Sequence, residues 1–191
     1  MKIAYLGPSG TYTEKAAKAY SENTEAKLIP CKNIRDVFEH VKNEIADAGV
    51  VPNETSFTGG VEATIDCLLE YCKDENKNIG VIEAIQMPVH HSIGALKKHS
   101  KINKILSKYE AFKQCSEYIH EKYRSAKQIE TESTAAAIDI IVSKNLKSAA
   151  AIADKNVLIS KGLEVIAENI ENYEHNETRF IVIKRGISKT P

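Results

Sequence analysis

The residues best suited to chemistry lie near the end of the chain, in the run Asn176-Glu177-Thr178-Arg179-Phe180-Ile181-Val182-Ile183. Here polar side chains lead directly into an apolar, β-branched strand. Thr178 offers a hydroxyl, and Arg179 offers a guanidinium that can hold a carboxylate with two parallel hydrogen bonds. We therefore hypothesise a ligand cleft in which Thr178 is the reactive hydroxyl. An edge strand with a solvated arginine is the open alternative.

The composition of the 191 residues allows one large domain or two small lobes. Lys+Arg and Asp+Glu both number 26, and this zero formal charge argues against nucleic-acid binding, which usually shows as a basic excess. No apolar run approaches the ~20 residues of a membrane-spanning helix, and the N-terminus is typical of a strand rather than a signal peptide. We expect a soluble, cytoplasmic protein with four free thiols: Cys31, Cys67, Cys72 and Cys115.

A glycine turn, Gly7-Pro8-Ser9-Gly10-Thr11, follows a predicted strand at 3–6 and precedes a predicted helix at 13–20. Backbone N–H groups at such a helix start attract anions. A tight turn with a threonine cap explains the same residues. The turn is neither a dinucleotide fingerprint nor a Walker A loop, so we expect no nucleotide cofactor.

Two further loops are rich in hydroxyls. Residues 52–60 follow a predicted strand at 48–51, at the strand end where open α/β sheets bind ligands. Thr131-Glu132-Ser133-Thr134 opens a helix at 135–143, and helix capping explains only one of its hydroxyls. His90 and His91 are neighbours that would point to opposite faces of a strand, so we expect no metal site.

The order of elements predicts two α/β lobes joined by two crossing strands, with a ligand cleft between them. A first set of strand–helix units is followed by a charged loop at 73–78 and a long extended segment at 79–93; a second set follows. We place lobe 1 at 1–85 and 174–191 and lobe 2 at 86–173. A continuous helix is expected at 111–123. Another amphipathic helix is predicted by the helical spacing of Val61, Thr64, Ile65, Leu68, Leu69 and Cys72.

These motifs together resemble the catalytic domain of the prephenate dehydratase family, nearly end to end. The family's G-P-x-G-T and N-x-T-R-F motifs are present at 7–11 and 176–180. Its P-I-E-N-S loop corresponds to 52–56, its S-T-A helix start to 133–135, and its A-A-I-A strand to 150–154. The order and spacing of the motifs carry the resemblance, and N-x-T-R-F is the most specific of them.

The resemblance implies a two-lobe fold similar to type II periplasmic binding proteins. It implies decarboxylating dehydration of prephenate to phenylpyruvate, a lyase reaction of phenylalanine biosynthesis that needs no cofactor or metal. Thr178 would assist loss of the ring hydroxyl, and Arg179 would hold a carboxylate or support the strand. A homodimer or homotetramer is expected. The implied substrate-binding residues are Ser9, Gly10, Thr11, Thr55, Ser56, Thr131, Ser133, Thr134 and Phe180.

Some positions depart from the family pattern. Thr55 stands where the family has asparagine, and Asn53 where it has an apolar residue. Residues 107–110 replace S-H-P-Q, although Gln114 and Cys115 downstream match. Most members continue into an ACT domain that binds phenylalanine, whereas this sequence ends at Pro191, which leaves loss of feedback or a shortened chain open. The alternatives are an arogenate dehydratase, a prephenate decarboxylase, or a non-catalytic module that binds a small carboxylate.

Overall fold

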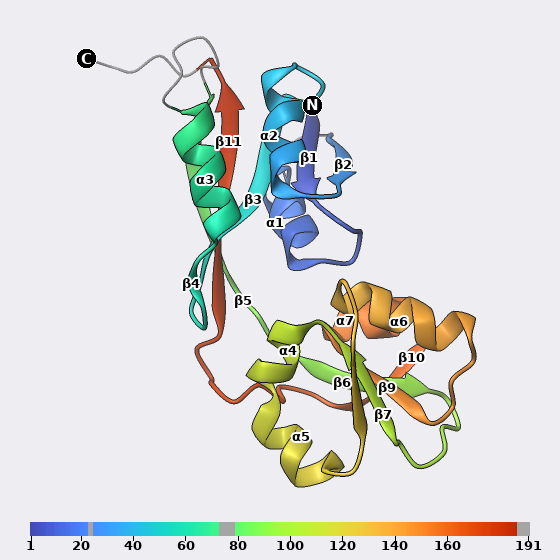
Figure 1. Ribbon diagram of the computed structural model, residues 1–191. Helices are drawn as coiled ribbons and strands as arrows, with labels where there is room; N and C mark the ends of the chain where they lie inside the picture. Colours follow the sequence, from blue (N-terminus) through green and yellow to red (C-terminus); the bar gives the residue numbers. More distant parts are fainter. Residues whose placement is uncertain (23–24, 73–78, 187–191) are drawn as a thin grey trace. The chain divides into compact units, whose positions relative to one another are not determined.

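The computed structural model describes residues 1–22, 25–72 and 79–186 and divides into two compact α/β units (Figure 1). The first unit combines residues 1–88 with the segment that begins at Glu177, and the second spans 89–176. The predicted α/β class is confirmed. The chain passes between units at 88/89 and 176/177, where the sequence suggested 85/86 and 173/174. The charged loop expected at 73–78 lies outside the described residues.

In the first unit, a sheet has the strand order β2-β1-β3-β11-β5, with the short β4 paired to β3. Strands β1, β2 and β3 run parallel, whereas β11 is antiparallel to both of its neighbours. The returning segment therefore becomes an interior strand. The elements are β1 (Lys2–Leu6), α1 (Tyr12–Tyr20), β2 (Lys27–Cys31), α2 (Ile34–Lys42), β3 (Ala48–Thr55), β4 (Gly59–Gly60), α3 (Glu62–Tyr71), β5 (Ile79–Pro88) and β11 (Glu177–Arg185).

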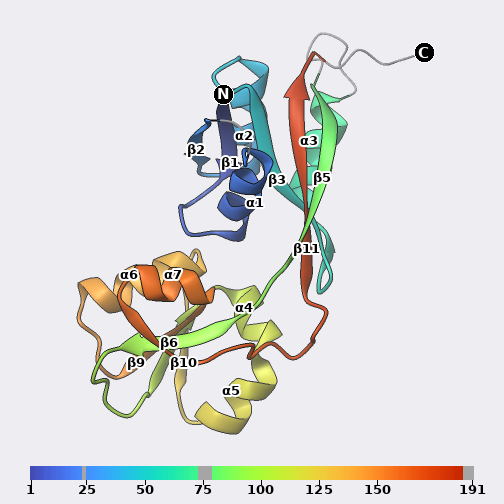
Figure 2. The same cartoon turned by 180° about the vertical axis from the view of Figure 1, so that it is seen from behind.

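Helix α1 covers one face of this sheet, and α2 and α3 cover the other (Figures 1 and 2). Strand β11 contributes to both layers because successive side chains of a strand point to opposite faces. Phe180 and Val182 pack in the layer with α1, whereas Ile181 and Ile183 pack with α2 and α3. The β-branched run after Thr178 is therefore a core strand, which fixes the polar residues at its start.

The predicted helix after residue 60 exists as α3, and its expected buried face is only partly correct: Thr64 is buried and Leu68 packs against the core. Cys67 and Tyr71 are buried, while Ile65 and Leu69 are 43% and 51% exposed. The Tyr71 ring packs against Phe38 of α2 with ring centroids 5.3 Å apart. An aromatic ring buries more area than an aliphatic side chain, so Tyr71 sets the orientation of α3.

In the second unit, a sheet has the strand order β10-β6-β9-β7-β8. Helices α4 and α5 pack on one face, and α6 and α7 on the other. The carboxyl ends of β7, β8 and β9 share one edge because these strands are parallel. The elements are β6 (Ser92–Leu96), β7 (Lys104–Ser107), α4 (Tyr109–Gln114), α5 (Ser116–Tyr123), β8 (Lys127–Glu130), α6 (Thr134–Ser143), β9 (Ala149–Ala153), α7 (Lys155–Ser160) and β10 (Leu163–Ala167).

The single helix expected at 111–123 is interrupted at Cys115, between α4 and α5. Asn172, far along the chain, supplies hydrogen bonds at the break. Its backbone N–H donates to the Gln114 carbonyl at 2.6 Å, and its side-chain oxygen accepts from the Glu117 N–H at 3.1 Å. Backbone groups freed by a helix break need partners. A distant residue meets this need, which local periodicity cannot reveal.

All four cysteines are free, and Cys31, Cys67 and Cys115 are buried. Burial raises the pKa of the Cys115 thiol far above its ordinary value, so this thiol stays protonated.

None of the helices in the described ranges combines the length and apolar character that a membrane crossing requires. The same ranges contain no group of three His, Cys, Asp or Glu side chains arranged to hold a metal ion.

Candidate functional site

The start of β11 lies between two strands that fix the direction of each side chain. Thr178 is opposite Thr55 of β3 and Met87 of β5, and the next residue, Arg179, is opposite Glu54 and Gln86. The pairing of β11 with β5 is regular here, so Thr178 and Arg179 point to opposite faces of the sheet. The structure therefore separates the hydroxyl and the guanidinium that adjacency in sequence had placed together.

The Thr178 side chain is only partly buried. Within the described ranges its hydroxyl makes no side-chain hydrogen bond, whereas its cross-strand neighbour Thr55 is 2.7 Å from the Thr58 hydroxyl and accepts from the Thr58 N–H at 2.9 Å. The predicted loop at 52–60 is in fact the end of β3, a short turn and β4. The Ser56 hydroxyl in this turn accepts from the Glu177 N–H at 3.0 Å, which ties the turn to β11. The hydroxyl of Thr178 can therefore donate to a ligand without breaking an internal bond.

Phe180, which the resemblance included among the substrate-binding residues, is 2% exposed and packs in the core layer with α1. A side chain so buried cannot contact a substrate in this conformation. Phe180 anchors β11 through the apolar area that it removes from water, worth about 2 kcal/mol for a large side chain. We correct its role to that of a core residue.

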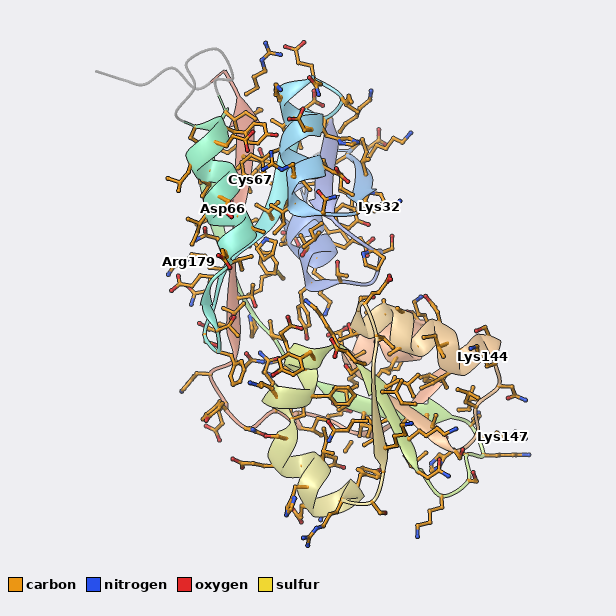
Figure 3. All side chains as sticks on the ribbon, viewed as in Figure 1. Lys32, Asp66, Cys67, Lys144, Lys147 and Arg179 are labelled. Atoms are coloured by element: carbon orange, nitrogen blue, oxygen red, sulfur yellow. The ribbon has the colours of Figure 1, made fainter. Side chains whose placement is uncertain are left out.

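Arg179 faces the side of the sheet that carries α3, and Figure 3 shows it next to the start of that helix. Its guanidinium is 3.2 Å from Glu54, and both side chains are about half exposed. They line a small cavity of about 160 Å³ together with Ser56, Gln86 and Glu177. Two carboxylates and one guanidinium give this cavity a negative balance, which does not suit a carboxylate ligand. The geometry favours the structural role of Arg179.

The glycine turn before α1 is held by hydrogen bonds within the first unit. Thr11 caps α1 by accepting from the Glu14 N–H at 3.3 Å, and Glu14 accepts from the Gly10 N–H at 2.6 Å. Gly10 has φ +85°, a conformation that suits glycine. The Ser9 hydroxyl is 3.0 Å from that of Tyr5. The capping interpretation therefore accounts for Thr11 and Gly10. It does not involve the Ser9 hydroxyl, which contacts Tyr5 instead.

In the second unit, two of the three motif hydroxyls make hydrogen bonds within their own loop and one does not. Ser133 is buried and caps α6, because its hydroxyl accepts from the Ala136 N–H at 3.0 Å. Thr131 donates to the Ser133 carbonyl at 2.9 Å. Thr134, the first residue of α6, makes no side-chain hydrogen bond to the rest of the described chain. Two of these three hydroxyls therefore stabilise the loop, and Thr134 is the one left for a ligand.

Sequence reasoning missed a buried polar cluster in the second unit. His91 Nε2 lies 2.6 Å from Gln114 Oε1, and Gln114 Nε2 donates to Asn176 Oδ1 at 3.0 Å. Glu171 accepts from the His91 backbone N–H at 2.9 Å. The motif positions of Gln114 and Asn176 were a signal for two members. Nothing in the local pattern connected His91 or Glu171 with these two residues: His91 lies 23 residues before Gln114, and Glu171 lies near Asn176 but far from Gln114.

Burial lowers the pKa of His91, although the hydrogen bond to Gln114 and the carboxylates of Glu171 and Asp154 oppose this effect. Taking an imidazolium out of water costs more than these partners return, so the ring is neutral near pH 7. A neutral ring has one N–H donor and one bare nitrogen. Which nitrogen of His91 carries the proton therefore depends on the hydrogen-bond partners of the ring.

A family model described as "PDT: Prephenate dehydratase" matches residues 3–188. The chain belongs to the prephenate dehydratase family. A prephenate dehydratase from Methanocaldococcus jannaschii is 35% identical over 97% of this chain. Arogenate dehydratase 1 from Petunia hybrida is 32% identical over 97%. A crystal structure of prephenate dehydratase from Arthrobacter aurescens in complex with L-Phe is similar with a TM-score of 0.86 and 30% identity over 98% of this chain.

The chain spans only part of these longer family members. It covers 65% of the Methanocaldococcus jannaschii protein, 42% of the Petunia hybrida protein and 61% of the Arthrobacter aurescens chain. The Arthrobacter aurescens prephenate dehydratase has the same fold over nearly all of the present sequence. Family membership and fold thus rest on nearly the full length of this chain.

Proposed function

We propose that this chain catalyses the decarboxylating dehydration of prephenate to phenylpyruvate, in the biosynthesis of phenylalanine. The family match over residues 3–188 supports the reaction class. One observation carries the proposal: the Thr178 hydroxyl lies in the N-x-T-R-F motif and has no side-chain partner within the described residues. A ligand can therefore receive its hydrogen bond without a competitor from the protein.

The reaction breaks two bonds of the substrate. The ring carboxylate leaves as carbon dioxide, its bonding electrons enter the ring, and the carbon–oxygen bond to the ring hydroxyl breaks. The departing oxygen takes up a proton and leaves as water, which balances the equation. Restored aromaticity drives the step, so the protein needs to place the leaving group and stabilise developing charge. Thr178 donates a hydrogen bond to the departing oxygen.

Other hydroxyls supply the hydrogen bonds that orient the substrate. Among the residues that the resemblance implied, we propose Ser9, Thr55 and Ser56 in the first unit and Thr134 in the second as ligands of the substrate. Gly10, Thr11, Thr131 and Ser133 support their loops through internal hydrogen bonds. Ser9, Thr55 and Ser56 also make internal hydrogen bonds, to Tyr5, Thr58 and Glu177, so they would bind the substrate in addition to these bonds or in exchange for them. The paired Arg179 and Glu54 stabilise the end of the sheet.

Arogenate is the second candidate substrate, and a named relative favours it. The Petunia hybrida protein is an arogenate dehydratase at 32% identity, close to the 35% of the archaeal prephenate dehydratase. Thr55 provides a short hydroxyl where the family pattern has an amide, which changes the donors and acceptors beside Thr178. We therefore propose prephenate as the substrate and arogenate as the alternative.

Product identification tests the function. The purified chain is incubated with prephenate at neutral pH, with arogenate in a parallel assay, and the products are separated and identified. Phenylpyruvate from prephenate supports the proposal, and phenylalanine from arogenate at higher kcat/KM assigns the second substrate. A non-aromatic decarboxylated product would show a prephenate decarboxylase. Tight prephenate binding without turnover would show a binding module.

We further propose a homodimer or homotetramer in the cytoplasm. The buried, unpaired thiols of Cys31, Cys67 and Cys115 suit a reducing compartment. Light scattering coupled to size exclusion measures the mass of the particle. A monomer at assay concentration would contradict the oligomeric part of the proposal and would leave the catalytic part standing.

A further inference from the structure

The two passages of the chain between the units are paired on the side of the second unit. The Val89 N–H donates to the Asn176 carbonyl at 2.7 Å, and the buried Asn176 side-chain amide donates to the Val89 carbonyl at 2.9 Å. At the next position Glu177 lies opposite Pro88, and the backbone N–H and carbonyl of Glu177 bond to Ser56 on the β3 side rather than to β5. The bonds between Asn176 and Val89 therefore join the two passages next to a position where the Glu177 backbone does not bond to β5.

The Val89 carbonyl determines which group donates in each side-chain hydrogen bond from Asn176 through Gln114 to His91. The carbonyl of Val89 only accepts, so the Asn176 group that faces it is the NH₂ and the other group is the oxygen. That oxygen accepts from the Gln114 NH₂, so the Gln114 oxygen faces His91. The partner nitrogen of His91, Nε2, must therefore carry the proton.

His91 closes this chain of hydrogen bonds from a fixed position. Its backbone N–H donates to Glu171 at 2.9 Å, and its carbonyl accepts from the Ile170 N–H at 3.0 Å. The residue is 4% exposed. Its Nδ1 has no hydrogen-bond partner in the part of the chain that the structure describes. Only Nε2 therefore links the ring to the cluster.

We propose that His91 is a positioning residue: its Nε2–H orients Gln114, Gln114 orients Asn176, and Asn176 holds β11 in register with β5 beside Thr178. The inference rests on the proposed function only in its kinetic consequence. Thr178 lies two residues after Asn176 and opposite Met87, and the intervening Glu177 directs its backbone groups to Ser56 rather than to β5. Loss of the Nε2–H donor lets this end of the ladder shift and misplaces the Thr178 hydroxyl.

Two amide substitutions at His91 distinguish the role of Nε2 from that of Nδ1. His91→Gln carries an NH₂ near the position of Nε2, whereas His91→Asn reaches only to the position of Nδ1, which has no partner. We expect His91→Gln to keep a kcat close to that of the unsubstituted protein. We expect His91→Asn to lower kcat about tenfold or more with little change in KM, because small displacements of a reacting group are costly.

Unfolding curves of both variants normalise kcat to the folded fraction. Equal kcat for the two variants per folded molecule would overturn the proposal, since a purely structural role changes stability alone. The ¹⁵N shifts of the His91 ring in the unsubstituted protein test the tautomer without any turnover. A protonated Nε2 and bare Nδ1 are expected, and the reverse pattern overturns the inference. A protein inactive on prephenate but with the expected tautomer would instead contradict the proposed function and the kinetic consequence together.

Discussion

Thr178 in the first unit and Ser133 in the second are both hydroxyl residues of family motifs, but the fold uses them differently. Thr178 is at the start of a strand, and within the described ranges its hydroxyl makes no side-chain hydrogen bond. Ser133 is the cap of α6 and accepts from the Ala136 N–H. A strand satisfies its backbone through its neighbours, so its side chains are released, whereas a helix start requires a side-chain acceptor.

The internal hydrogen bonds of a hydroxyl therefore indicate whether its loss should change stability or turnover. A hydroxyl that completes an internal bond should affect unfolding when it is removed, and a hydroxyl without an internal partner should affect turnover. The presence of a hydroxyl residue in a family motif does not by itself tell these two kinds of hydroxyl apart.

Thr178→Val should have the largest effect. The isosteric methyl group keeps the shape of the side chain and removes the donor, so kcat for prephenate should fall about 100-fold or more, as expected for loss of proton assistance. The free energy of unfolding should change little because no internal side-chain bond is lost. Steady-state kinetics and urea unfolding measure the two effects. Near-normal turnover would show that the Thr178 hydroxyl does not assist the reaction.

Ser133→Ala should destabilise the second unit by about 1 kcal/mol, the usual cost of a lost helix cap, with kcat per folded molecule preserved. Ser133→Asn is the matched control, because asparagine caps as well as serine and lacks the hydroxyl. Asparagine should restore stability and, like alanine, leave kcat per folded molecule unchanged. Restored stability with a strongly raised KM would show instead that the Ser133 hydroxyl binds substrate.

Tyr71→Phe tests the rule at an internal hydrogen bond of the first unit, where Tyr71 donates to Glu39. The variant should lose about 1 kcal/mol of unfolding free energy and no turnover. Burial and this bond raise the pKa of Tyr71 to about 12, and the bond lowers the pKa of Glu39. The wild-type advantage should therefore be complete between the ordinary pKa values of 4.5 and 10 and shrink outside that range. Urea unfolding across pH measures it, and a flat difference would contradict the bond.

The ion pair of Arg179 and Glu54 should have the smallest effect. Both side chains are half exposed, so a double-mutant cycle with Arg179→Gln and Glu54→Gln should give a coupling below ~1 kcal/mol. Turnover should stay within a few-fold of the unsubstituted protein. A large rise in KM for Arg179→Gln alone, without a change in unfolding, would assign the guanidinium to a substrate carboxylate.

Local patterns predicted the two α/β units because hydrophobic runs and turn residues are local signals. The same signals predicted the strand that begins near Thr178. They failed at α3, where spacing favoured Ile65 and Leu69 but the tertiary contact of Tyr71 with Phe38 decided the buried face. They also failed at the break between α4 and α5, whose partner is the distant Asn172.

The candidate site was predictable in its residues more than in its geometry. The motif proposed Thr178 and Arg179, and strand alternation alone puts neighbouring residues on opposite faces. The cross-strand neighbours of each, Thr55 and Met87 or Glu54 and Gln86, depend on pairing with β3 and β5 and could not be predicted. The cluster around His91 joins residues from three separated stretches, and no spacing rule connects them. Its members become recognisable only when the fold brings Gln114 and Asn176 together.

The most direct test of the account compares Thr178→Ser with Thr178→Val in single-turnover reactions with prephenate. Serine keeps the donor and loses only a methyl group, so the chemical step should stay within about tenfold of the unsubstituted protein, whereas valine should slow it about 100-fold or more. Such a difference supports the hydroxyl of Thr178 as the group that assists departure of the ring hydroxyl. Equal rates for the two variants would contradict it.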